Sequence, residues 1–502
     1  MAVTASEVAP ETPTRTAFRP LQAILALGGI QALSMAAGLA RTKVLALLLG
    51  PAGLGIVGVI DQTISLVTHL GSLSFPFAAL TFLSRRRGEG GQGFARLYLA
   101  FFKVLLAASL LATVLAIGVA LWRTELIAAE LAPYRMPLGM GLVGAPALAA
   151  ASYLRSVLAA VERHHQAALF ALLGGLALIG TSYAGVKLGG LTGLYVGNLA
   201  VALLMAPLIV RYLRRGGAVP GRGGGEPALR VLGQEPGLVG FCATIHLLSL
   251  FSPVAYLIAR VAVLSHHGEV EAGLFYAGYG LAVAVRVVLS QANLLYLTPI
   301  LNQPTSKAER AAAAAEYLRV LVVILMVGAL AIALFPREWV LVLYSPRFAE
   351  AATFVAAFLL AEAILLLASV YQMLLIGFQD VRAHALIAVA GQVVLAALSL
   401  AWVPALGSLG VALAFVAGHG VILLLLLARL HLRHHAAALA RPLPLLLVGL
   451  GVLAAAGWWA AGAPALGWKL GVYLLVSVGF VSLLTGEERR WLLAPWRRKP
   501  TS

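Results

Sequence analysis

The sequence predicts an all-α polytopic membrane protein with about fourteen transmembrane helices, on three observations. First, 61% of the 502 residues are hydrophobic and 11% are charged, whereas about a quarter of a soluble chain is charged. Second, the apolar residues form runs of the length, about 20 residues, that a spanning helix needs. Third, the 36 Lys and Arg outnumber the 19 Asp and Glu, and they cluster in alternate loops between these runs.

The apolar runs place the spans in order along the chain. We expect them at residues 21–49, 53–83, 97–121, 136–160, 167–187, 190–212, 237–264, 272–300, 313–335, 350–377, 384–403, 408–430, 442–461 and 465–485. Residues 1–20 are polar and lack the short apolar core and small-residue cleavage site of a signal peptide, so they predict a cytoplasmic tail. The single Cys242 gives neither an internal disulfide nor a metal motif.

The basic loops predict the orientation of the chain. When both termini are placed in the cytoplasm, nearly all clustered Lys and Arg fall in the inside loops, and the outside loops carry only scattered ones. Cytoplasmic loops therefore explain the formal net charge of +17, and nucleic acid is not expected as a partner. No outside loop is long enough to be a folded domain.

The longest inside loop divides the chain into two halves. Its Gly-, Pro- and Arg-rich segment GGAVPGRGGGEP predicts a flexible linker over 213–236. Internal similarity across the linker aligns Gly190 with Gly407 and Gly193 with Gly410, and more weakly Arg41 with Arg260. Repeats of this kind are typical of transporters. We expect a tail at 1–20, six-helix lobes at 21–212 and 237–432, two extra helices at 433–485 and a cytoplasmic tail at 486–502.

Several spans carry polar residues on one helical face. In the first span, Gln31, Ser34 and Arg41 lie on one face because their separations match helical spacing, whereas Lys43 lies about 200° from Arg41 on an ideal helix. Five cations lie within or near the ends of spans, together with two acids and one amide. They are Arg41, Lys43, Arg155, Arg260 and Arg286, then Asp61 and Glu362, and Asn293.

A cation in hydrocarbon costs roughly 2.5–3.5 kcal/mol on insertion scales, so these cations need a compensating environment. One hypothesis is a shared, water-filled central cavity of positive potential, in which guanidinium groups bind a diphosphate. The alternative is structural: Asp61 pairs with Arg41 or Lys43, Glu362 pairs with Arg286, and Arg155 and Arg260 snorkel from the span ends.

The segment RTKVLALLLGPAGLGIVGVIDQTISLVTHLGSLSF (Arg41–Phe75) resembles the start of polysaccharide-biosynthesis flippases, in particular O-antigen and enterobacterial-common-antigen translocases. These belong to the multidrug/oligosaccharidyl-lipid/polysaccharide exporter superfamily. The resemblance implies a two-lobed transporter that moves an undecaprenyl-diphosphate-linked oligosaccharide across the bacterial inner membrane. Lipid II flippases of the same superfamily carry arginines that fall on Arg41 and Arg286, and they have two extra C-terminal spans.

The resemblance implies a lipid-linked oligosaccharide and membrane lipid as partners, and polysaccharide polymerase and chain-length proteins as further ones. We expect no enzyme activity and no cofactor, and the sequence contains no GxxxxGK[ST] motif. Asp61 and Glu362 are the candidates for proton or sodium coupling in an alternating-access cycle. The alternatives are a lipid II flippase, a membrane polymerase or ligase of the same pathway, a drug exporter, and a non-transporting scaffold.

Overall fold

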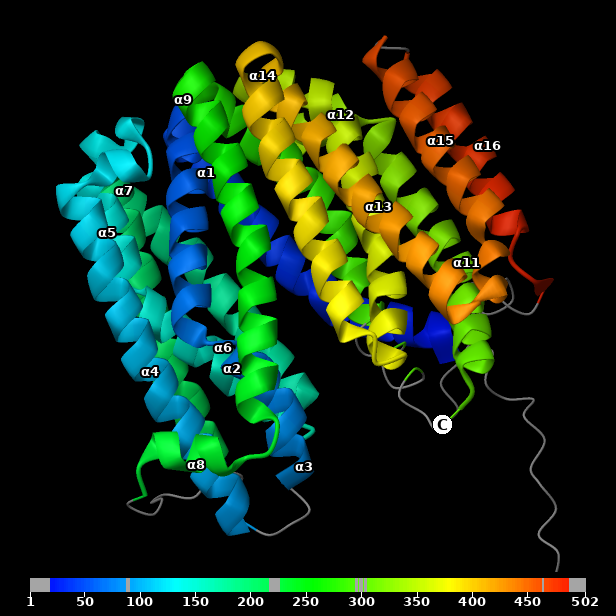
Figure 1. Ribbon diagram of the computed structural model, residues 1–502. Helices are drawn as coiled ribbons and strands as arrows, with labels where there is room; N and C mark the ends of the chain where they lie inside the picture. The colour runs from blue at the N-terminus through cyan, green and yellow to red at the C-terminus, as the bar shows by residue number, and fades with distance from the viewer. Residues whose placement is uncertain are drawn as a thin grey trace, which may run out of the picture.

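In the computed structural model, every regular element among the described residues is a helix (Figure 1), which confirms the all-α fold class. The structure describes residues 19–86, 91–215, 226–293, 297, 301, 305–462 and 465–486, with side chains from Leu33 onward. The predicted tails at 1–20 and 486–502 and the centre of the linker lie almost entirely outside the described residues.

The helices before the linker form the first lobe, which we call the N-lobe. They are α1 (Arg19–Ser72), α2 (Phe75–Ala78), the π-helix η1 (Ala79–Leu83), α3 (Ser84–Arg86), α4 (Gly91–Trp122), the short η3 (Thr124–Leu126) and η4 (Ala129–Tyr134), α5 (Arg135–Val143), α6 (Ala145–Ala160) and α7 (His164–Arg215).

The helices after the linker form the second lobe, which we call the C-lobe, and an appended pair. The C-lobe consists of α8 (Ala228–Gln234), α9 (Leu238–Ala292), α11 (Lys307–Ala333), α12 (Pro336–Leu343), η6 (Pro346–Ala351), α13 (Ala352–Gly377), α14 (Val381–His434) and η7 (Ala437–Ala440). The appended pair is α15 (Leu443–Ala461) and α16 (Leu466–Ser482).

Nine helices in the described part of the chain are long and apolar enough to cross a membrane, and α16 is a shorter apolar helix. Four of the nine, α1, α7, α9 and α14, contain 52 to 55 residues and are broken by residues with non-helical dihedral angles. Each break falls at the boundary between two predicted spans. Each of these helices therefore consists of two arms, the first before the break and the second after it. Every predicted span therefore corresponds at least in part to a helix or an arm, and the chain is a multi-pass membrane protein.

The breaks match in pairs across the two lobes. Gly190 (φ 58°, ψ −140°) has nearly the same dihedral angles as Gly407 (φ 55°, ψ −135°). Gly50 (φ 67°, ψ −172°) likewise matches Gly268 (φ 79°, ψ −176°). Positive φ is costly for residues with a Cβ, and glycine adopts it freely. The match at Gly190 and Gly407 agrees with the repeat expected from the sequence.

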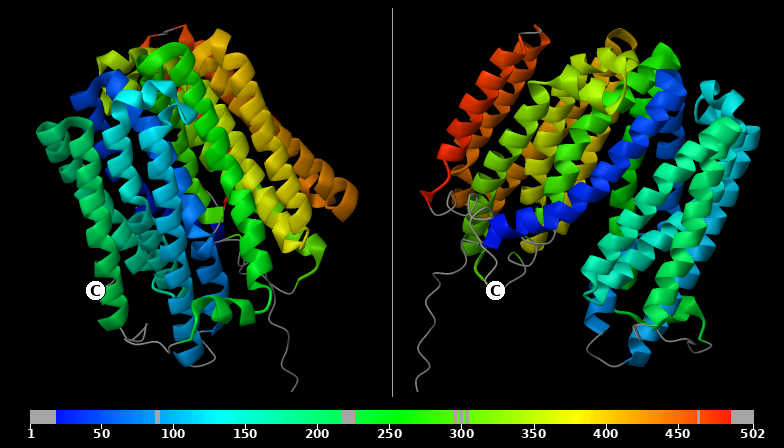
Figure 2. Two further views of the ribbon diagram at one scale, coloured as in Figure 1. Left: turned by 60° about the vertical axis from the view of Figure 1, so that its left-hand side comes forward. Right: turned by 180° about the vertical axis from the view of Figure 1, so that it is seen from behind.

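Each broken helix folds back on itself. In α7 a Cβ on Gly193 would lie 2.1 Å from the Gly185 carbonyl oxygen, and in α14 a Cβ on Gly410 would lie 2.7 Å from that of Trp402. Such close backbone approach is possible because the glycine has no Cβ. Figure 2 shows α1 rising and turning back at the same end of the molecule as α9 and α14. We call this end the turn side, and the end at residues 213–236 the linker side.

The lobes share a hydrophobic core on the turn side. One buried cluster joins α1 residues such as Leu54 and Ile60 to α9, α11, α13 and α14. A second cluster, around Tyr153 and Phe101, is confined to the linker-side half of the N-lobe and the start of α9. The lobes are therefore packed together on the turn side and diverge toward the linker side (Figures 1 and 2).

Candidate functional site

A cavity of about 600 Å³ lies within the N-lobe, between the arms of α1 and α7 and the helices α5 and α6. Its polar lining residues include Arg41, Asp61, Ser65, Thr68, His69, Ser152, Arg155, Tyr195 and Asn198. Glycines and aliphatic side chains such as Gly174, Gly175 and Leu148 form the rest of the wall. Mostly apolar walls with a few converging polar groups are typical of ligand sites.

Arg41 lies in the first arm of α1 and is held by neutral groups of α7. Its Nε donates to Ser182 Oγ at 2.9 Å, and Nη2 donates a long hydrogen bond to Asn198 Oδ1 at 3.5 Å. Among the described residues, no carboxylate forms an ion pair with Arg41. Its positive charge is therefore oriented toward the cavity without being neutralised by the protein.

Asp61 lies in the second arm of α1, on the wall of the same cavity. Its Oδ1 accepts a hydrogen bond from Tyr195 Oη at 3.0 Å. The alternative in which Asp61 pairs with Arg41 or Lys43 is not what the structure shows, because no described cation lies within ion-pair distance of Asp61. The carboxylate is instead held by the hydrogen bond from the Tyr195 hydroxyl.

Arg155 is the second cation of the cavity. It lies in α6, near the linker-side end of that helix, and lines the cavity together with Arg41. Within the described part of the chain, no residue accepts a hydrogen bond from it. Two arginines and one aspartate thus give the described lining a net positive formal charge. Ser34 is half-buried and does not line this cavity, and the side chain of Gln31 lies outside the described residues.

Two predicted cations lie elsewhere. Lys43 donates a hydrogen bond from Nζ to the carbonyl oxygen of Val342 in α12, so it links the lobes. Arg260 is 9% exposed, and its guanidinium carbon lies 5.2 Å from the ring centre of Phe275, 5.4 Å from Tyr276 and 5.7 Å from Tyr279. Aromatic ring faces stabilise a cation electrostatically. Lys43, Arg260 and Arg286 do not line the N-lobe cavity, so a central cavity shared by all five cations stays a prediction.

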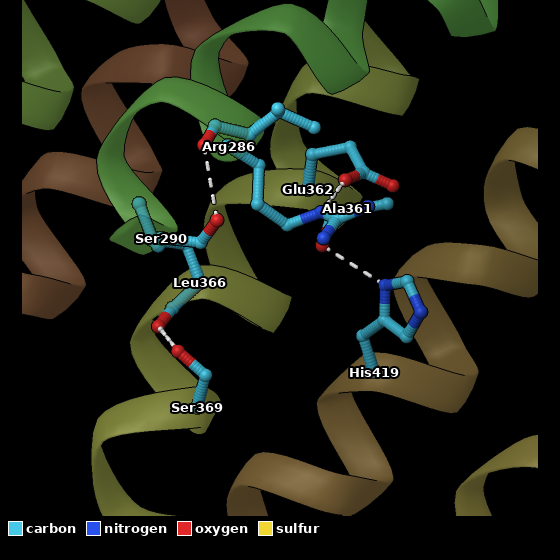
Figure 3. A network of polar contacts seen from close by, with 8 residues as sticks. Arg286, Ser290, Ala361, Glu362, Leu366, Ser369 and His419 are labelled. Atoms are coloured by element: carbon cyan, nitrogen blue, oxygen red, sulfur yellow. Dashed lines mark hydrogen bonds and ion pairs between the residues drawn. The ribbon is translucent and has the colours of Figure 1, made fainter. Parts of the chain in front are cut away.

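Arg286 and Glu362 form an ion pair in the C-lobe, as the structural alternative expected (Figure 3). Arg286 lies in the second arm of α9, and its Nε donates to Glu362 Oε2 of α13. Asn293 donates to Ser369 Oγ at 2.6 Å and accepts from Tyr317 Oη at 2.6 Å. Because Asn293 is fully buried in these bonds, it is a packing residue in this conformation.

The sequence reasoning missed the neutral partners of the cations. Ser182 and Asn198 each lie eight residues from the turn at Gly190, so the fold-back places them at the same depth on adjacent arms. Their equal distance from a predicted turn could therefore have identified both residues from the sequence. Tyr195, 1% exposed and bonded to Asp61, had no such signal, because an apolar helix contains many tyrosines that only pack.

No protein-family model matches the chain, and no curated protein matches it in sequence. Solved structures do share its fold. The lipid II flippase MurJ in an inward closed conformation aligns with a TM-score of 0.66 at 14% identity, covering 91% of this chain and 98% of that chain. An inward-facing multidrug resistance MATE family transporter of the MOP superfamily aligns with a TM-score of 0.65 at 16% identity, covering 84% and 99%.

The chain shares the fold of these solved structures. A MOP superfamily transporter from Pyrococcus furiosus, described with a binding pocket of reverse polarity, also aligns, with a TM-score of 0.61 at 15% identity over 86% of this chain and 99% of that one. Identities this low establish the fold alone. Within this fold, the sites described above are observations on this chain: an N-lobe cavity with two arginines that have no carboxylate partner among the described residues, and a C-lobe ion pair.

Proposed function

We propose that the protein is a flippase that carries an undecaprenyl-diphosphate-linked oligosaccharide, of the O-antigen repeat-unit type, across the bacterial inner membrane. The observation that carries the proposal is the N-lobe cavity, in which Arg41 and Arg155 have no carboxylate partner among the described residues. Two unneutralised guanidinium groups in one cavity are suited to a diphosphate, because each can donate two parallel hydrogen bonds to phosphate oxygens.

The dimensions and walls of the cavity support a polar headgroup as the occupant. A volume of about 600 Å³ falls within the range of small-molecule sites, about 300–1,000 Å³. Ser65, Thr68 and Asn198 offer neutral hydrogen-bonding groups of the kind that contact sugar hydroxyls. The prenyl tail stays in the bilayer, where burying it in protein brings no advantage over lipid.

The packing of the lobes supports alternating access. Close contact on the turn side and divergence toward the linker side correspond to a transporter open on one side. With the linker in the cytoplasm, as the basic loops predict, that side faces the source of the lipid-linked substrate. Asp61 and Glu362 are the proposed coupling residues, and membrane polymerase and chain-length proteins are the proposed recipients of the flipped product.

A lipid II-type peptidoglycan precursor is the second candidate substrate, and one observation favours it. The alignment with lipid II flippase MurJ covers 91% of this chain, against 84% to 86% for the two MOP transporters named above. The larger coverage by the flippase is expected if α15 and α16 have counterparts in that protein.

The test is a flipping assay with the purified full-length chain in proteoliposomes. Fluorescent undecaprenyl-diphosphate oligosaccharide and fluorescent lipid II are supplied separately, and the fraction accessible to a membrane-impermeant quencher is followed with time. We expect Arg41→Ala and Arg155→Ala each to slow flipping by about tenfold or more, since a charge-assisted hydrogen bond contributes about 1.5–3 kcal/mol.

Arg123→Ala is the matched control, because Arg123 is an exposed arginine of the same lobe, paired only with Glu125 at 3.4 Å. It should flip at the wild-type rate. Normal flipping by both cavity variants at wild-type protein content would overturn the proposed role of the cavity. The substrate that the wild type moves faster decides between the two candidates, and movement of neither would refute the flippase proposal.

A further inference from the structure

The Arg286–Glu362 pair is asymmetric in its exposure. The Glu362 side chain is 2% exposed, whereas that of Arg286 is 24% exposed. Arg286 uses Nε for the ion pair, and its two terminal Nη groups make no hydrogen bond with any described residue. The Nη groups are thus donors that the ion pair leaves free, on the more exposed of the two side chains. An anion can reach the arginine without displacing the glutamate.

Glu362 carries an unused acceptor in a buried place. Its Oε1 is buried and has no hydrogen-bond partner among the described residues, whereas Oε2 accepts from Arg286. A buried polar atom without a partner is uncommon and costs free energy. A proton on Oε1 would remove the negative charge and so lower the cost of leaving that oxygen without a donor. Glu362 thus has one carboxylate oxygen bonded to Arg286 and a second oxygen with no described partner.

The ionisable groups that act on this pair come from both arms of α9 and from α14. Tyr256 and Tyr279 of α9 are the aromatic hydroxyls of the surroundings, and His419 of α14 is the imidazole. His419 is completely buried, and its Nδ1 lies 3.0 Å from the carbonyl oxygen of Ala361, the residue before Glu362 (Figure 3). Because a carbonyl only accepts, Nδ1 carries the hydrogen, and the unpaired Nε2 is the free acceptor in neutral His419.

We propose that Glu362 is a proton-binding site that controls anion binding by Arg286. With Glu362 ionised, the pair is electrically neutral and attracts a diphosphate weakly. When Glu362 takes up one proton to become a carboxylic acid, the guanidinium keeps its own proton and its full positive charge, and its Nη groups can bind phosphate oxygens. The inference rests on the proposed function and adds to it a C-lobe subsite and the ion that governs it.

A proton fits this site better than a metal cation. A sodium ion bound to Glu362 would lie next to the Arg286 guanidinium, where the two positive charges repel. A proton bonds covalently to one oxygen and needs no other ligand. Linkage then works in both directions: protonation strengthens anion binding, and a bound anion raises the proton affinity of Glu362 by the same factor.

The experiment measures binding of undecaprenyl diphosphate to the full-length chain in lipid nanodiscs at about pH 5.5 and about pH 8. We expect the wild type to bind about tenfold more tightly at the lower pH, within the usual range of coupling between sites. The diphosphate itself gains a proton between these values, since the second pKa of a phosphate is about 6. A site without a coupled carboxylate therefore binds it more weakly at the lower pH, which is the opposite sign.

Glu362→Gln imitates the protonated acid, so it should bind at pH 8 nearly as tightly as the wild type does at pH 5.5. Glu316→Gln is the matched control, an exposed glutamate on α11 of the same lobe, and should keep the wild-type pH dependence. His419→Gln should keep it too, because the proton resides on Glu362. If Glu362→Gln fails to fold, titration calorimetry of the wild type in two buffers of different ionisation enthalpy measures proton uptake on binding directly.

Three results would overturn the proposal: affinity that falls at lower pH in the wild type, no proton uptake on binding, or pH dependence that disappears in His419→Gln and survives in Glu362→Gln. Failure of the flippase proposal would give results different from these three. Arg41→Ala should lower the affinity at both pH values and leave their ratio unchanged. Absence of diphosphate binding by the wild type at either pH would remove both proposals together.

Discussion

Arg41 and Arg286 are both arginines in apolar helices, one in each lobe, but their charges are handled differently. Arg41 is held by the hydroxyl of Ser182 and the amide of Asn198, which orient the guanidinium without cancelling its charge. Arg286 is held by the carboxylate of Glu362, which does cancel it. Among the described residues, no carboxylate neutralises the first arginine, whereas the second is neutralised by Glu362.

The comparison shows why counting intramembrane charges is a poor guide to a binding site. Two arginines with the same cost of transfer into hydrocarbon differ in their local net charge because of the residues that each contacts. An ion pair that is this deeply buried also contributes less stability than its Coulomb attraction suggests, since both groups lose their hydration. Removing only one partner of such a pair nevertheless lowers the stability of the protein strongly.

The largest effect is expected from Arg286→Ala, which leaves Glu362 buried without its partner. We expect a loss of about 3 kcal/mol in the free energy of unfolding, since breaking one side of a buried pair costs about 3–5 kcal/mol. Arg41→Ala should cost less than about 1 kcal/mol, because it leaves only neutral, hydrogen-bonding groups behind. Chemical unfolding in detergent micelles measures both values.

A double variant makes this prediction specific. Arg286→Ala combined with Glu362→Gln removes the orphaned charge and should recover at least half of the lost stability. Equal unfolding free energies for Arg286→Ala and Arg41→Ala would show that the two arginines are held alike, and the comparison would then be wrong.

A smaller effect is expected at one contact between the lobes on the turn side, where glycine meets backbone. A Cβ on Gly273 of α9 would lie 1.9 Å from the carbonyl oxygen of Pro51 in α1, so Gly273→Ala must push the lobes apart on the turn side. Overpacking of this kind costs about 1–3 kcal/mol. Gly139→Ala is the control, because a Cβ there meets no atom within 4 Å.

The same variant has a conformational readout. Val57 is completely buried in the turn-side core, so a cysteine placed there in a Cys242→Ser background reports opening by maleimide labelling. We expect faster labelling in Gly273→Ala than in the wild type or Gly139→Ala. Unchanged labelling would mean that the turn side adapts to the methyl group without separating.

The smallest effect is expected at a charge cluster that closes α14 on the linker side. Asp380 Oδ2 accepts from Arg429 Nε at 2.8 Å and lies 2.9 Å from His434 Nε2. The hydrogen bond from Arg429, followed by that from His434, lowers the pKa of Asp380 to about 2. Because the Arg429 side chain is 40% exposed and solvent screens its charge, we expect Asp380→Asn to lower the melting temperature at neutral pH by only about one degree.

The pH dependence of this effect has a definite sign. The pKa of Asp380 is below the ordinary value of about 3.9, so its contribution is complete above that value and is lost as the pH falls through about 2. Melting curves of the wild type and Asp380→Asn should therefore differ by the same amount at pH 5 and pH 7 and converge at the acid end. A difference that grows on acidification would contradict this assignment.

Most of the fold could be predicted from the sequence, because apolar length and glycine position determine it. Runs of about 20 apolar residues can only be spanning helices in a chain with so few charges. The turns at Gly50, Gly190, Gly268 and Gly407 follow from the need for positive φ between adjacent runs. The fusion of paired spans into continuous helices was not predictable, since it depends on a turn that occupies a single residue.

The candidate site was only partly predictable. Helical spacing placed Arg41 on a polar face, but it could not show that Ser182 and Asn198 complete that face from a helix about 140 residues later. The Arg286–Glu362 pair was an open alternative, because two opposite charges in apolar helices can meet or remain separate. The aromatic surroundings of Arg260 had no sequence signal, since tyrosine and phenylalanine occur throughout these helices.

The one-glycine turns also determine how the molecule can be handled in the laboratory. Where the chain reverses within a single residue, there is no projecting loop that a protease could cleave, that could accept an epitope tag, or that an antibody could bind. On the turn side, polypeptide long enough for these purposes lies at residues 123–135 and 334–351, among the described ranges. Affinity reagents raised against that face should therefore compete with one another for two small patches, and insertions should be tolerated there first.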